Sequence, residues 1–218
     1  MRRESSTVVA LVGEVTSGLL AGLGRSGNVS VGPAPAAGPA GPEPGPVPSP
    51  GSGSVRPGSG PVRPGWEPGA QAMREAARRH APYVVVPADP LAGVAAAWRS
   101  MWDVAEGPGA AAQFEDQAAQ ALAAWHGKQF ELPDYYLVVA PVQPGGTGAD
   151  LYLGPLRAAR ARRVAVAAVG SEPGQTGRVL DALRGLEHGP WWPPLDELID
   201  TARHFYAGGL AETQPPAA

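Results

Sequence analysis

The segment from Gly32 to Gly69 constrains the fold of this chain more than any other feature, because it cannot pack into a core. Of its 38 positions, 12 are Pro and 10 are Gly, and its only large apolar side chain is Trp66. Burial cannot offset the entropy of ordering such a segment, which predicts a disordered linker. The chain therefore divides into an N-terminal segment (1–31), the linker (32–69), an α/β domain (70–212) and a disordered tail (213–218).

The N-terminal segment permits two interpretations. Its apolar residues recur at steps of three and four, which favours an amphipathic helix; they are Val8, Val12, Val15, Leu19 and Leu23. The alternative is a buried strand over Thr7 to Gly13, whose composition also fits. Because Glu14 interrupts the apolar run and no A-x-A-like cleavage site follows it, the sequence predicts neither a signal peptide nor a membrane span.

Three short apolar runs predict strands, at Tyr83–Val86, Tyr135–Ala140 and Arg163–Val169. Continuous apolar runs are typical of parallel strands that are covered on both faces. Helical segments alternate with these runs, as they do in α/β proteins. The sequence thus predicts a small three-layer αβα domain with a short, mostly parallel sheet of three to four strands, preceded by the disordered Pro/Gly-rich linker.

Helix signals fill the intervals between the strands. Asp89 and Pro90 open one helix, with Asp89 as the N-cap, and it is expected to extend to about Trp102. Further helices are predicted at 71–80, around Phe114 to Trp125, at 155–162, at 175–187 and at 194–206.

Composition narrows the class of protein. The net charge is −3, which disfavours a wide nucleic-acid footprint, and Lys128 is the only lysine. The chain has no Cys, so disulfides, thiolate zinc sites and iron–sulfur clusters are excluded. Its four His residues are isolated in sequence, so no metal site is predicted. We expect no cofactor and a cytoplasmic protein.

Ligands of open parallel sheets bind beyond the carboxyl ends of the strands. Three loops lie there: the one with Asp89, residues 143–150 and residues 170–177. Glycines in the latter two would let backbone amides and Thr hydroxyls face an anion, with Arg157 as a clamp. The candidate ligand-binding residues are Asp89, Gly145, Gly146, Thr147, Gly148, Asp150, Arg157, Ser171 and Thr176.

The formal motifs for such sites are incomplete. Neither glycine-rich loop has the Lys that a phosphate loop requires. The dinucleotide pattern started at Gly146 meets Leu151 where Gly or Ala is needed, and Ser171 does not lie in a G-x-S-x-G turn. Ordinary turns in a glycine-rich chain therefore remain an alternative interpretation of both loops.

Trp191 and Trp192 are adjacent, so both cannot face one core from one element, and one of them is expected to cover a loop, a ligand or a partner. The hypothesis is that Trp191 or Trp192 lies at a partner contact or at the mouth of a ligand site. The sequence favours a non-enzymatic accessory or protein-interaction protein, in which the linker tethers the α/β domain to an N-terminal helix that docks elsewhere. The partner would be another protein. The alternative is a nucleotide- or phosphate-binding α/β enzyme that uses the loops after the second and third strands to hold a small anionic ligand.

Overall fold

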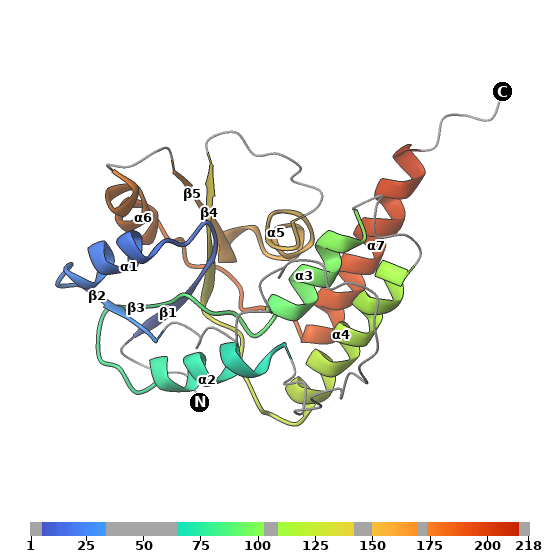
Figure 1. The fold of residues 1–218 in the computed structure, drawn as a ribbon, viewed down its shortest axis with the longest axis horizontal. Coiled ribbons are helices and arrows are strands. Elements are labelled where there is room, and N and C mark those ends of the chain that lie inside the picture. The colour runs from blue at the N-terminus through green and yellow to red at the C-terminus, as the bar shows by residue number, and fades with distance from the viewer. Residues whose placement is uncertain (1–5, 34–64, 103–108, 142–149, 170–173, 214–218) are drawn as a thin grey trace, which may run out of the picture.

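The computed structural model describes residues 6–33, 65–102, 109–141, 150–169 and 174–213 (Figure 1). Its centre is one five-stranded sheet with the order β2-β3-β1-β4-β5, and every strand pair is parallel. The strands are β1 (Thr7–Gly13), β2 (Val29–Val31), β3 (Tyr83–Val86), β4 (Tyr135–Pro141) and β5 (Val164–Val169). The mixed α/β class predicted from the sequence is confirmed, and the predicted count of three to four strands is too low.

Of the two interpretations of the N-terminal segment, the strand over Thr7–Gly13 is confirmed, and the helix is wrong where it covers residues 7–13. These residues form β1, the central strand, and its five residues Val8–Val12 are all buried. The helical spacing arose because two elements follow one another: Leu19 and Leu23 are the buried residues of helix α1 (Ser17–Gly24). Strand β2 has only three residues, too few for a period to show in the sequence.

Helices connect the strands. The longer ones are α1, α2 (Glu67–Ala76), α3 (Ala92–Ser100), α4 (Gly109–His126), α6 (Gln175–Arg184) and α7 (Leu195–Thr213). Between β4 and β5 lie a π-helical turn η3 (Tyr152–Leu156), a short α5 (Arg157–Ala159) and a 3-10 turn η4 (Ala161–Arg163). The prediction of a single helix over 155–162 is therefore wrong, because three short helical turns of different types occupy this segment and the first begins at Tyr152. Asp150 explains the earlier start, since its Oδ1 accepts hydrogen bonds from the backbone N–H of Tyr152 and Leu153.

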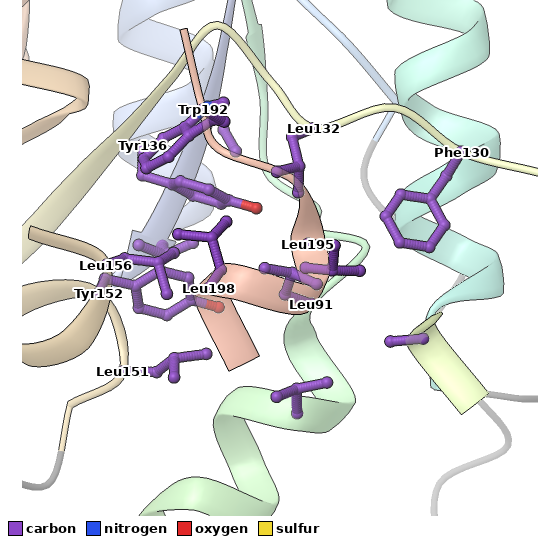
Figure 2. Packing of buried hydrophobic residues seen from close by; sticks show 14 of the residues in the cluster. Leu91, Phe130, Leu132, Tyr136, Leu151, Tyr152, Leu156, Trp192, Leu195 and Leu198 are labelled. Carbon is purple, nitrogen blue, oxygen red and sulfur yellow. The ribbon is translucent and has the colours of Figure 1, made fainter. Parts of the chain in front are cut away.

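Two apolar clusters cover the two faces of the sheet. On one face, helices α1 and α6 pack on Val9, Leu11 and Leu137. On the other face, helices α2, α3, α4 and α7 and the turn η3 pack on Val8, Ala10 and neighbouring strand residues. Figure 2 shows part of this second cluster, in which Tyr136 and Tyr152 lie among Leu91, Leu156, Trp192 and Leu198.

The end of the predicted linker is wrong, because residues 65–69 belong to the folded part. Trp66 stacks on Phe130 with 6.2 Å between ring centroids, and α2 begins at Glu67. The bulk of the predicted linker, residues 34–64, lies outside the described residues. In the part of the chain that the structure describes, no helix is long and apolar enough to cross a membrane.

Candidate functional site

The sheet places a crevice at the carboxyl end of β1. The helix after β1 (α1) packs on one face of the sheet, whereas the helices after its neighbours β3 and β4 (α3 and η3) pack on the opposite face. Connections that leave adjacent strands toward opposite faces open a crevice at their carboxyl ends, where α/β proteins bind ligands. The strand order thus locates a candidate site beyond the ends of β1, β3 and β4.

A cavity of about 760 Å³ lies at this place, and we call it the carboxyl-edge cavity. Its volume falls within the usual range for small-molecule sites. The ends of β1, β3 and β4, the start of α2, one side of α3 and the turn η3 all contribute walls. Its charged and hydroxyl-bearing lining residues are Glu14, Asp89, Arg99, Asp150 and Tyr152.

Asp89 is the buried polar group of this cavity, with 5% of its surface exposed. Its Oδ1 accepts a hydrogen bond from the Tyr136 hydroxyl at 2.7 Å, and its Oδ2 accepts one from the Tyr152 hydroxyl at 2.5 Å. The predicted N-cap role of Asp89 is wrong, because α3 begins at Ala92 and has no side-chain cap. The carboxylate instead joins β3, β4 and η3.

Burial controls the protonation of this cluster. It raises the pKa of the Asp89 carboxyl above its ordinary value, against the lowering effects of the Tyr152 hydroxyl, the Leu91 backbone N–H and the Tyr136 hydroxyl. Burial and the charge of Asp89 also raise the pKa of Tyr136 and Tyr152. Both phenols therefore stay protonated at neutral pH and remain hydrogen-bond donors to Asp89.

The charges around the cavity are unbalanced. Glu14, Asp89 and Asp150 supply three carboxylates, and Arg99, an exposed residue of α3, supplies one cation. Within the described ranges, no Lys, Arg or His forms an ion pair with the Asp89 carboxylate. A buried carboxylate that is held only by neutral donors favours a cationic or hydrogen-donating ligand over an anion.

Two glycines allow the backbone to form these walls. A Cβ on Gly69 of α2 would overlap the main chain of Asp89 and Pro90, so only Gly permits α2 to approach the end of β3. Gly13 has φ +93°, and a Cβ there would overlap the carbonyl oxygen of Val139. Substitution at either position would displace the strand ends that border the cavity.

The structure brings only part of the predicted ligand set together. Asp89 and Asp150 line the same cavity. Arg157 is exposed on α5, and it is not among the residues lining the cavity. Thr176 packs against Gly22 of α1, on the opposite face of the sheet from η3. Gly145, Gly146, Thr147, Gly148 and Ser171 lie outside the described residues.

Sequence reasoning missed the loop after β1, because that segment was expected to be helical. Gly13 and Gly18 have the G-x4-G spacing of a phosphate loop, directly after a strand and at the start of a helix. Leu19 and Leu20 occupy the positions where such a loop has Lys and Ser or Thr, and Leu19 is buried. The loop thus has the backbone context of a phosphate site without its charge. The contribution of Tyr136 and Tyr152 to the site was also missed, because each lies in an apolar run that predicts a core residue.

The adjacent residues Trp191 and Trp192 lie in different environments, as expected from the sequence. Trp192 is buried, donates its Nε1–H to the carbonyl oxygen of Pro133 at 2.8 Å, and packs on Tyr136. Trp191 is 44% exposed, and its ring lies 4.9 Å from the guanidinium of Arg163. That guanidinium donates to the carbonyl oxygens of Asp134, Gly189 and Pro190, so the loop presenting Trp191 is firmly held.

Trp191 also borders a second cavity of about 760 Å³ at the amino ends of the strands. Its position distinguishes it from the carboxyl-edge cavity, because its walls include the first residues of β1 and β4. The partner role predicted for Trp191 stays a prediction.

No protein-family model, curated protein or solved structure matches this chain. The described residues contain no group of three or more His, Cys, Asp or Glu side chains arranged to hold a metal ion.

Proposed function

We propose that this chain is a three-layer αβα binding protein whose carboxyl-edge cavity takes a small organic cation, such as an amine. The observation that carries the proposal is Asp89: a buried carboxylate at the wall of a cavity, held by two phenol hydroxyls and with no cation against it among the described residues. An amine would supply the opposite charge that burial makes favourable. The wall residues Ala88, Ala92 and Ala95 leave room for its carbon skeleton.

The phosphate-binding enzyme is the alternative, and the charges support it less. A phosphate at the start of α1 would lie beside Glu14, and the loop offers Leu19 where a phosphate loop has Lys. Arg99 is the one cation that lines this cavity in the described ranges. We therefore assign the acidic lining to recognition of a positive group.

Thermal-shift measurements on the full chain test the proposal. The probes are putrescine, agmatine and choline on one side, and inorganic phosphate, AMP and ATP on the other, each at millimolar concentration. A ligand present at 100 times its Kd stabilises the folded state by about 2.7 kcal/mol. Amines should raise Tm, and they should not do so in Asp89→Asn, which keeps the shape of the side chain without its charge. Stabilisation by phosphates instead of amines would contradict the proposal.

A second function, contact with another protein, has its own observation in Trp191. Trp residues are enriched among the few residues that contribute most to binding at protein interfaces, and a rigidly held side chain loses less conformational entropy on binding. Deleting residues 1–31 cannot test this function, because the deletion removes the central strand β1. Trp191→Ala is the suitable variant, because it should abolish recovery of a partner in a pull-down and leave the sheet intact. The cytoplasmic location and the linker role of residues 34–64 stay predictions from the sequence.

A further inference from the structure

Strand β5 forms one edge of the sheet, and within the described ranges no other strand and no charge or Pro of its own protects that edge. Its six residues are Val-Ala-Val-Ala-Ala-Val, with no charge and no Pro. An edge strand presents unpaired backbone N–H and C=O groups, and proteins normally block such an edge with Lys, Pro, a bulge or a covering segment. Val166 in the middle of β5 is 39% exposed, and Ala168 is exposed as well.

The opposite edge shows the contrast. Strand β2 has only three residues, and the Arg79 guanidinium donates to the Ser30 hydroxyl at 3.0 Å and the Val31 carbonyl at 2.6 Å. Short length and a covering side chain are two recognised means of edge protection. In the described part of the chain, β5 pairs with no strand other than β4, and its one side-chain donor is Arg178, to the carbonyl of Ala168 at its far end.

We propose that β5 is a dimer interface, on which the β5 strand of a second copy pairs antiparallel across a two-fold axis. Directly opposite residues in an antiparallel pair share a face, with Cβ atoms about 4.5–5.5 Å apart. The register centred on the exposed Val166 places it against Val166 of the second copy, and the buried Val164 against the exposed Ala168. This pairing buries the exposed apolar centre of the strand and satisfies the open backbone groups of both copies.

The charge of Arg162 favours this orientation. Arg162 is exposed two residues before the strand, whereas the neighbouring Arg163 is buried and donates to three backbone carbonyls. In the antiparallel pair the two Arg162 residues lie at opposite ends, about 26 Å apart for eight residues at 3.3 Å each. A parallel pair would place the two Arg162 residues side by side. A two-fold pair also closes at the dimer, because the same edge is used by both copies.

Sedimentation velocity of the full chain, from micromolar to submillimolar concentration, tests the proposal. We expect a dimer that dissociates on dilution. Val166→Lys places like charges opposite each other at the axis and should weaken the dimer by at least about tenfold, which corresponds to roughly 1.4 kcal/mol. The matched control is Ala119→Lys on the exposed side of α4, which should leave the dimer unchanged. A monomer throughout, or a dimer equally stable in Val166→Lys, would overturn the proposal.

The absence of Cys provides a second readout that does not depend on destabilising anything. Val166→Cys places one thiol on the two-fold axis, and the expected separation of the two Cβ atoms approaches the range of about 3.5–4.5 Å found in disulfides. Mild oxidation should convert this variant to a covalent dimer on a non-reducing gel. Ala119→Cys should stay monomeric under the same conditions. Equal crosslinking of the two variants would show that β5 is not the contact.

Discussion

Replacing Tyr152 by Phe removes the hydroxyl that donates the shorter hydrogen bond to Asp89, at 2.5 Å. The ring keeps its packing against Tyr136, whose centroid lies 5.1 Å away. A hydrogen bond to a charged group contributes about 1.5–3 kcal/mol, and one between neutral groups about 0.5–1.5 kcal/mol. The loss in stability should therefore depend on whether Asp89 is ionised.

The sign of this dependence follows from the cluster. The Tyr152 hydroxyl favours the ionised form of Asp89, so its removal raises the pKa of Asp89 further. At low pH, where Asp89 is protonated in both proteins, the variant loses only a neutral hydrogen bond. As pH rises and Asp89 of the wild type ionises, the difference between the two proteins grows.

Urea denaturation followed by circular dichroism at pH 5 and pH 8 measures this difference. We expect a loss of about 2 kcal/mol at the higher pH, which for a chain of this size lowers Tm by about 4–8 °C. The control is Tyr135→Phe, whose hydroxyl donates to the neutral carbonyl of Glu187 at 3.1 Å and should give a loss independent of pH. If Tyr152→Phe lost the same free energy throughout the pH range over which Asp89 of the wild type titrates, the carboxylate would not be the acceptor that matters.

Three further outcomes are expected. Burial raises the pKa of Asp89 above 3.8, so the folded state binds the proton of Asp89 more tightly than the unfolded state does. This contribution to stability is lost as pH rises through the folded-state pKa. In the same denaturation assay, the stability of Asp89→Asn relative to the wild type should therefore increase from pH 4 to pH 8. Gly69→Ala should lower Tm strongly, because its Cβ overlaps the Asp89 backbone, whereas Gly177→Ala in α6, with no neighbour within 4 Å, should stabilise the protein by about 0.5–1 kcal/mol. Arg163→Met should destabilise the protein by at least about 2 kcal/mol, since three backbone carbonyls lose their donor, and equal stability would show that solvent replaces these bonds.

The sequence predicts an element correctly where only one secondary-structure pattern, either strand or helix, is present in the segment. Tyr83–Val86 is an apolar run bounded by Pro82 and Pro87, and the structure places β3 on these residues. At β1 two signals compete, since a strand buried on both faces has no period of its own and the adjacent α1 supplies a helical one. Pairing partners decide such a case, and they lie more than 70 residues away along the chain.

The candidate site, too, is predicted from the sequence only in part. Asp89 and Asp150 are found from the sequence because they lie where strands end. The role of Asp89 cannot be predicted from the sequence, because an Asp before Pro at the start of a helix resembles an N-cap. Only the fold brings the hydroxyls of Tyr136 and Tyr152 to its two carboxylate oxygens. Side chains that sit 47 and 63 positions from Asp89 leave no local pattern.

We propose above that the carboxyl-edge cavity binds a small organic cation through Asp89. Isothermal titration calorimetry of the full chain with the amine that gives the largest thermal shift tests it most directly, with Asp89→Asn as the comparison. We expect saturable one-to-one binding that weakens by at least about tenfold in Asp89→Asn and also weakens when pH falls below the pKa of Asp89. Equal affinity for the two proteins, or binding that strengthens as Asp89 is protonated, would contradict the claim.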